Sequence, residues 1–222
     1  MSVRPKIIYF DIRGRAETIR LLFEELGEPY DEHRLRSPEE WAAMKPETPF
    51  GALPIYQEGD LEFAQTQAIY RHIARTRGLY GKSEREHIEC DVAEEAINEA
   101  IGNLWQVFWQ RDYAAQLPTF AAGPFGGVLK NLERWFTRAS PTPRFWVGDA
   151  LTYVDAFAFR LLDEVEALVP RGLDATPALR TFHRAYAARP RAAAYIASGR
   201  RPAAFGYGID GPVRDQRGRG GV

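Results

Sequence analysis

The first 27 residues constrain the fold most, because they place a strand, a tight turn and a helix in direct succession. Residues 6–10 read KIIYF, a nearly continuous apolar run that is typical of a strand covered on both faces. The turn DIRGR follows at 11–15. Over 16–27 apolar residues recur at helical spacing, and Gly27 supplies a stop. This succession predicts a layered α/β unit.

Strands and helices continue to alternate up to about residue 80. Residues 32–35 read EHRL, a weaker strand. Residues 55–63 hold two short apolar runs around Glu58-Gly59-Asp60, which indicates a hairpin. A helix is expected over 66–76. The order β-α-β followed by β-β-α defines a first domain over 1–80.

From about residue 85 the pattern changes to long helices. One helix is expected over 85–115, with an apolar stripe formed by Ile88, Val92, Ile97, Ile101 and Trp105. A loop with Pro118 follows, and the next helix covers about 125–138.

Three further helix starts are visible beyond it. Thr152 and Asp155 have the spacing of a capping box, which we interpret as structural. Thr176-Pro177 and Arg189-Pro190 begin two more helices. We therefore expect an all-helical domain over 85–205 and a glycine-rich tail over 206–222.

Composition narrows the class of function. The 222 residues include 29 basic and 30 acidic side chains, a balance that argues against a dedicated nucleic-acid binder. The sequence contains no run of eighteen apolar residues, so we expect no transmembrane helix. Its N-terminus lacks the apolar core of a signal peptide. One cysteine, Cys90, fits a reducing compartment, so we expect a cytoplasmic protein. The four histidines show no metal-ligand spacing, so no metal is expected.

Several segments together resemble the cytosolic glutathione S-transferases of the tyrosine type, most of all the sigma and pi classes. They are YFDIRGRAETIRLLFEELG, FGALP, QTQAI, GDALTYVDA and RPRAAAYIAS, and the resemblance covers residues 5–205. It implies a thioredoxin-like N-terminal domain, an all-helical C-terminal domain and a homodimer. It also implies glutathione as co-substrate and a small hydrophobic electrophile as its partner in the reaction.

The resemblance assigns a catalytic pair. Tyr9 matches the tyrosine whose phenol stabilises the glutathione thiolate, and core packing of a strand tyrosine is the alternative. Arg15 matches a residue that adds positive potential near the sulfur, and a solvated residue at a helix start is its alternative. A thiol with a pKa near 8.5 is only about 3% ionised at pH 7, so lowering that pKa is the chemical task.

Other positions match residues that hold the glutathione peptide. Pro54 matches a cis-proline that turns the backbone of Leu53 toward the cysteinyl part, with an ordinary trans proline as alternative. Gln65 and Thr66, at a helix start, match the site of the γ-glutamyl carboxylate, and plain N-capping by the threonine is compatible with that role.

The two ends of the peptide have further candidates. Trp41 and Lys45 match residues at the glycyl end, although the tryptophan also suits simple packing. Glu99 matches an acidic residue that reaches the glutathione of the partner subunit, with a solvated helix face as alternative. Ala52 departs from the family's glutamine and Thr66 from its serine, which predicts reduced glutathione affinity.

The remaining assignments concern the electrophile and the dimer. The resemblance places in the electrophile pocket Phe10, Ile12, Trp105, Trp109, Phe205 and Tyr207; for the tryptophan pair, core packing is the alternative. It places at the dimer interface Phe50, an aromatic that inserts into the partner, with Arg71, Arg75, Asp91 and Glu95. For these charged residues, a solvated surface pattern is the alternative.

The expected function is conjugation of the glutathione thiolate to apolar electrophiles, as in detoxification. Two alternatives remain open. One is glutathione-dependent isomerisation of a lipid, like the prostaglandin D synthases of the sigma class. The other is a non-catalytic carrier or structural protein on the same fold, for which Ala52 and Thr66 are the only support in the sequence.

Overall fold

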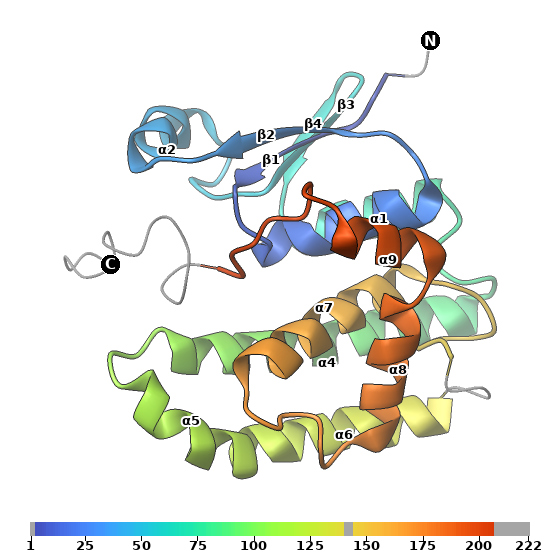
Figure 1. The fold of residues 1–222 in the computed structure, drawn as a ribbon. Coiled ribbons are helices and arrows are strands. Elements are labelled where there is room, and N and C mark those ends of the chain that lie inside the picture. Colours follow the sequence, from blue (N-terminus) through green and yellow to red (C-terminus); the bar gives the residue numbers. More distant parts are fainter. Residues whose placement is uncertain (1–2, 140–143, 207–222) are drawn as a thin grey trace. The chain divides into compact units, whose positions relative to one another are not determined.

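The computed structural model describes residues 3–139 and 144–206 (Figure 1). These residues form two compact units: the described parts of Met1–Ile73 and Arg191–Val222 make unit 1, and those of Ala74–Pro190 make unit 2. Residues 191–205 were expected in the helical domain but group with unit 1. The reason is that helix α9 (Pro190–Ala197) binds α1 (Glu17–Leu26): Arg191 Nη1 donates to the Glu25 carbonyl at 2.6 Å.

A four-stranded mixed sheet forms the centre of unit 1. Its strands are β1 (Lys6–Phe10), β2 (Asp31–Leu35), β3 (Ile55–Glu58) and β4 (Leu61–Ala64), in the order β2-β1-β3-β4. The β1–β2 pair is parallel, and the β1–β3 and β3–β4 pairs are antiparallel. The predicted strands and hairpin are confirmed.

Apolar side chains cover both faces of this sheet, as the uninterrupted apolar run of β1 requires. On one face, Ile8 joins Leu35, Ile55 and Ala64, and α2 (Pro38–Met44) adds Trp41 and Met44. On the other face lie α1 and α3 (Thr66–Thr76), and Phe23 of α1 stacks on Tyr56 of β3 at 6.3 Å between ring centroids.

Strand register brings three loops to one edge of the sheet. Ile8 pairs with Ile55, and Ile55 pairs with Ala64, so these residues form one row across three strands. Tyr9 follows Ile8, Pro54 precedes Ile55, and Gln65 follows Ala64. The segments that were predicted to bind glutathione therefore leave the sheet from adjacent positions.

Unit 2 is helical. It contains α4 (Glu84–Phe108), α5 (Tyr113–Ala122), α6 (Pro124–Ala139), α7 (Tyr153–Leu168) and α8 (Pro177–Ala187). The central α7 contacts both α4 and α8, and almost all of its first twelve residues are buried. Asp155 closes the predicted capping box, since its carboxylate accepts the Thr152 and Trp146 amide protons, each at 2.7 Å.

Two details of the predicted helices were wrong. The helix expected over 85–115 ends at Phe108, because the Gln110 amide bonds to Val107, three residues back, and tightens the chain into a turn. Pro118, expected in a loop, lies inside α5, which loses one intrahelical hydrogen bond without ending there.

No helix in the two described stretches is both long and apolar enough to cross a membrane. Within the same residues, no group of three or more His, Cys, Asp or Glu side chains is arranged to hold a metal ion.

Candidate functional site

Tyr9 and the turn after it form the centre of the candidate site. The backbone amide of Arg15 donates a hydrogen bond to the Tyr9 hydroxyl, with 3.0 Å between nitrogen and oxygen. A phenol oxygen that accepts this bond can still donate its own proton. The accepted bond polarises the O–H group and makes it a stronger donor. The arrangement suits stabilisation of an anion, such as a thiolate, by the tyrosine.

Gly14 makes this arrangement possible. Its φ of +43° is a conformation that residues with a side chain rarely adopt. A Cβ atom at this position would lie 2.6 Å from the Tyr9 hydroxyl oxygen and 2.9 Å from its ring. The glycine therefore lets the Arg15 amide approach the phenol.

The side chain of Arg15 is exposed, and its backbone is fixed by a second tyrosine. The hydroxyl of Tyr70, on α3, donates to the Arg15 carbonyl at 2.7 Å. The residue thus presents its guanidinium at the surface while both of its backbone polar groups are bound to tyrosine hydroxyls.

The Leu53–Pro54 peptide bond is cis, as the resemblance implied. Pro54 is buried at the start of β3, Leu53 is half-buried, and Ala52 is exposed. By the strand register, this loop leaves the sheet beside the end of β1. It presents backbone near Tyr9 from the neighbouring strand.

Gln65 is exposed and has a φ of +75°, which is unusual for a residue with a side chain. Such a conformation costs on the order of 1–3 kcal/mol and is found disproportionately at binding sites. Thr66, 5% exposed, begins α3 immediately after it. The start of a helix suits an anion, because its first amides have no partner within the helix and the helix dipole is positive there.

Trp41 and Lys45 lie differently from each other. Trp41 packs on the sheet and makes an edge contact with Phe10 at 5.4 Å between ring centroids, so packing accounts for much of its surface. Lys45 is exposed, and its Cε lies 3.5 Å from where a Cβ on Gly51 would be. The lysine therefore reaches toward the loop that leads to Leu53.

The residues expected at the electrophile fall into different environments. Ile12 is only 1% exposed, so its side chain does not offer the surface that the prediction assigned to it. Phe205 is half-buried, with the Arg13 guanidinium 4.0 Å from its ring centroid. Tyr207 lies outside the described residues. Trp109 is 59% exposed at the end of α4.

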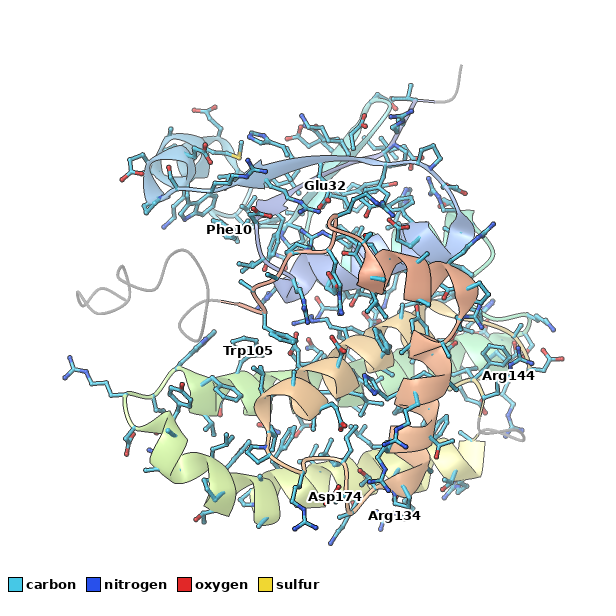
Figure 2. The ribbon with its side chains drawn as sticks, viewed as in Figure 1. Phe10, Glu32, Trp105, Arg134, Arg144 and Asp174 are labelled. Carbon is cyan, nitrogen blue, oxygen red and sulfur yellow. The ribbon has the colours of Figure 1, made fainter. Side chains whose placement is uncertain are left out.

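Trp105, labelled in Figure 2, is half-buried and hydrogen-bonded. Its indole Nε1 donates to Glu164 Oε2 on α7 at 2.8 Å, and Arg160 Nε donates to the other carboxylate oxygen at 2.9 Å. Burial raises the pKa of Glu164, while Arg160 and the indole act in the opposite direction. The indole is thus fixed in orientation, a contact that the sequence did not reveal.

The residues expected at a dimer interface include several exposed side chains. Phe50 is 66% exposed in its loop, and Glu95 is exposed on α4. Glu99, expected to reach the glutathione of the partner subunit, is exposed on the same helix. Arg75 lies over the Tyr80 ring at 5.8 Å, and the Tyr80 hydroxyl donates to Asp91 at 2.6 Å. Arg71, on the same face of α3 as Arg75, is half-buried.

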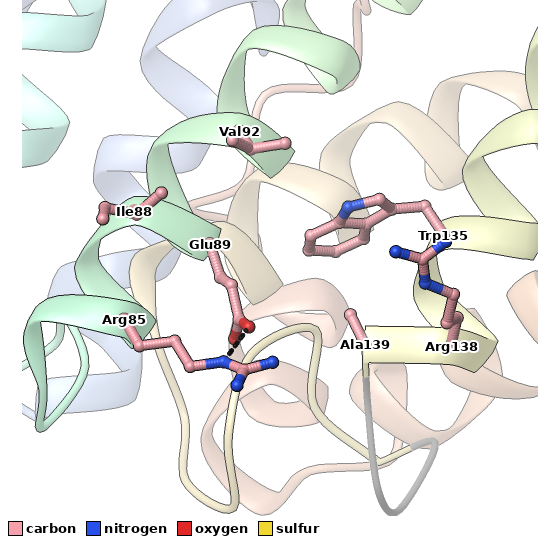
Figure 3. A pocket seen from close by; sticks show the side chains of 7 residues that line it. All are labelled: Arg85, Ile88, Glu89, Val92, Trp135, Arg138 and Ala139. Atoms are coloured by element: carbon pink, nitrogen blue, oxygen red, sulfur yellow. Dashed lines mark hydrogen bonds and ion pairs between the residues drawn. The ribbon is translucent and has the colours of Figure 1, made fainter.

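A cavity of about 260 Å³ lies between α4 and α6 (Figure 3). Its lining is Arg85, Ile88, Glu89, Val92, Trp135, Arg138 and Ala139. Ile88 and Val92, which belong to the predicted apolar stripe, are 55% and 50% exposed. Their spacing of four residues marks a helix face without saying what covers it, so the sequence did not indicate this cavity.

Two family models match the chain, one over each part. The N-terminal domain of glutathione S-transferases matches residues 5–75, and the C-terminal domain of glutathione S-transferases matches residues 98–199. The chain belongs to the glutathione S-transferase family, with a thioredoxin-like domain followed by an all-helical domain.

Individual relatives agree with this placement. Glutathione S-transferase P of Caenorhabditis elegans is 36% identical over 191 residues, and that of Homo sapiens is 30% identical over 200 residues. Each match covers 86% of this chain and 91% of the relative. The solved pi-class enzyme of Onchocerca volvulus superposes with a TM-score of 0.81 at 29% identity, covering 88% of this chain and 92% of that one. Of the two classes expected from the sequence, pi is therefore the one that these relatives represent.

Proposed function

We propose that this protein binds glutathione and transfers its thiolate to apolar electrophiles. The observation that supports this most is the hydrogen bond from the Arg15 amide to the Tyr9 hydroxyl, at the sheet edge that also holds the cis Leu53–Pro54 bond. A phenol polarised in this way is a donor suited to a sulfur anion.

The energy required is within reach of such a donor. Lowering a thiol pKa from about 8.5 by two units takes about 2.7 kcal/mol of preferential stabilisation of the anion. One hydrogen bond to a charged acceptor contributes about 1.5–3 kcal/mol. The exposed guanidinium of Arg15 adds positive potential, so Tyr9 need not ionise itself.

The peptide part of glutathione would bind to groups that flank Tyr9. Leu53 offers its backbone beside the cis bond, and Gln65 with Thr66 offers a helix start for the γ-glutamyl carboxylate. Lys45 offers a charge for the glycyl carboxylate. Because Trp41 is engaged in packing, we assign it a smaller part than Lys45.

Phe10, Trp105 and Trp109 remain the predicted contacts of the electrophile. Two tryptophans would favour flat, apolar substrates. The fixed indole of Trp105 would give such a substrate a firm surface, and the exposed indole of Trp109 would add a second aromatic face.

We also propose that the protein acts as a homodimer. The support is an exposed aromatic, Phe50, together with the half-exposed Ile88 and Val92 at the cavity beside Trp135 (Figure 3). Burial of these apolar surfaces against a second copy would be favourable. Sedimentation of the unaltered protein tests the dimer, and a monomer would contradict it. In Phe50→Ala, an unchanged dimer would show that Phe50 does not hold the interface. The cytoplasmic location stays a prediction.

The decisive experiment is the thiol pKa of bound glutathione in the unaltered protein and in Tyr9→Phe. We expect a pKa clearly below that of free glutathione, rising by about two units in the variant. An aryl halide acceptor measures conjugation in parallel. An unaltered protein that binds glutathione without lowering its thiol pKa would overturn the proposed activity. Products formed without net glutathione consumption would instead indicate an isomerase, and binding without turnover a carrier.

A further inference from the structure

The turn over residues 11–15 is held by contacts from distant parts of unit 1. Arg20, fully buried on α1, donates through Nη1 to the carbonyls of Ile12 and Arg13 at 3.0 and 3.1 Å. The Asp11 amide donates to the Leu35 carbonyl at the end of β2, at 3.0 Å. The position of the Arg15 amide, and hence its bond to Tyr9, depends on this set of contacts.

The most remote of these contacts come from residues 198–206, here called the strap, which follow α9. The Ala204 carbonyl accepts the Arg13 amide proton, and the Phe205 carbonyl accepts that of Gly14, each at 2.8 Å. These two bonds join segments about 190 residues apart in the chain. They fix the two residues that immediately precede Arg15.

The side chain of Arg13 binds the same strap. Its Nε donates to the Pro202 carbonyl at 2.9 Å, and its guanidinium lies over the Phe205 ring at 4.0 Å from the centroid. Arg13 therefore contacts three successive parts of the strap, through its backbone amide, its Nε and its guanidinium face. It is the residue of the turn that is most extensively bound to the strap.

The strap is itself anchored to α1. Arg201 Nε donates to Glu17 Oε1 at 2.7 Å, and both side chains are almost fully buried. The hydroxyl of Tyr195, on α9, donates to the other oxygen of the same carboxylate at 3.1 Å. Arg200 pairs with Glu24 at 2.6 Å from an exposed position. The strap is thus a defined part of unit 1.

We propose that the strap is a positioning element for thiol activation, and that Arg13 is the positioning residue through which it acts. By holding the amides of Arg13 and Gly14, the strap keeps the next amide, that of Arg15, in line with the Tyr9 hydroxyl. The polarisation of the phenol, and with it the stabilisation of a bound thiolate, depends on this alignment. The proposal rests on the proposed function, since it concerns the activation of glutathione by Tyr9.

The test compares two arginine variants in the full chain. Arg13→Ala removes the bond to Pro202 and the contact with Phe205, whereas Arg200→Ala removes only strap contacts that do not reach the turn. The main readout is the thiol pKa of bound glutathione, from the pH profile of kcat/KM and from thiolate absorbance. A second readout is amide hydrogen exchange over residues 9–16, which does not require glutathione.

We expect Arg13→Ala to raise the thiol pKa by about 0.5–1 unit. Starting from a bound pKa of about 6.5, this lowers the thiolate fraction at pH 7 about 1.5- to threefold. Exchange over residues 9–16 should become faster, and Arg200→Ala should change neither readout. Arg13→Lys keeps a cation and a donor, so it should shift the pKa less than alanine does. This graded rescue would not follow from a general loss of stability.

Two results would contradict the proposed role of Arg13. A thiol pKa in Arg13→Ala equal to that of the unaltered protein, or equal shifts in both alanine variants, would overturn the role of Arg13 as the positioning residue. If the unaltered protein does not lower the thiol pKa at all, the proposed function is wrong. In that case hydrogen exchange alone decides whether Arg13 and the strap hold the turn.

Discussion

Replacing Gly14 with alanine should place a methyl group against the hydroxyl of Tyr9. The new Cβ would lie 2.6 Å from the hydroxyl oxygen, whereas ordinary contacts begin at 3.4 Å, so the ring must retreat by about 0.8 Å. The hydrogen bond from the Arg15 amide, now 3.0 Å long, would then exceed the usual limit. Displacement of a catalytic group by about 1 Å can cost on the order of a hundredfold in rate.

We therefore expect Gly14→Ala to lower kcat/KM by about ten- to a hundredfold and to raise the thiol pKa of bound glutathione. Overpacking of this kind costs about 1–3 kcal/mol, in addition to about 1 kcal/mol of strain from the left-handed backbone. Gly59→Ala is the matched control, because Gly59 has a φ of +63° and nothing within 4 Å of its added Cβ. Gly59→Ala therefore introduces the same backbone strain without a steric clash of the added Cβ.

The measurements are urea unfolding, the pH profile of kcat/KM and glutathione affinity for both glycine variants. We expect only Gly14→Ala to shift the thiol pKa, although both variants lose stability. If the two variants show the same kcat/KM and the same thiol pKa, then the contact between Gly14 and Tyr9 does not determine activation.

Three further predictions concern unit 2. Trp105→Phe should lower the free energy of unfolding by about 1.5–3 kcal/mol, because the buried Glu164 carboxylate loses a hydrogen-bond donor. Trp109→Phe, at an exposed site, should change the free energy of unfolding by less than about 0.5 kcal/mol. Equal losses for the two variants in urea titrations would contradict this. Burial raises the pKa of Asp155 to about 7 from 3.8, although hydrogen bonds oppose the shift. Between pH 3.8 and pH 7 the Asp155 carboxyl is ionised in the unfolded chain but protonated in the folded protein. The free energy of unfolding should therefore fall by up to about 4 kcal/mol as the pH rises from 3.8 to 7, and level off above pH 7. Asp155→Asn should flatten this profile in urea titrations, and an unchanged slope would assign it to other groups. Burial also raises the pKa of the Cys90 thiol to about 12, so a thiol reagent at pH 8 should modify it only after unfolding, and rapid modification of the native protein would show that the site opens.

Local signals in the sequence were sufficient for most of the secondary structure. The apolar run at 6–10, the hairpin around Gly59 and the capping box at Thr152 each depend on neighbouring residues, and each appears where it was expected. The helix expected over 85–115 was wrong because the apolar residues continue past Phe108 while the backbone turns. A tightened hydrogen bond at Gln110, rather than a glycine or proline, ends the helix there.

Periodicity also predicts a helix face better than it predicts what covers that face. Ile97 and Ile101 are buried as their spacing suggests, whereas Ile88 and Val92, on the same expected stripe, are about half exposed. The first pair packs within unit 2, and the second lines the cavity beside Trp135. The spacing within each pair is the same, but nine residues separate Ile88 from Ile97, about 900° of helix rotation, so the two pairs lie on opposite faces of α4.

The contacts of the strap could not be predicted from local sequence patterns, because they join residues that are far apart in the chain. Arg13 and Phe205 are separated by almost the whole chain, and neither residue type indicates the other. The expected boundary at residue 85 placed Phe205 in the helical domain, whereas its carbonyl binds the turn beside Tyr9. If the strap acts as proposed, thiol activation by Tyr9 depends on residues at both ends of the chain. A motif at residues 9–15 then identifies the catalytic group without identifying everything that makes it effective.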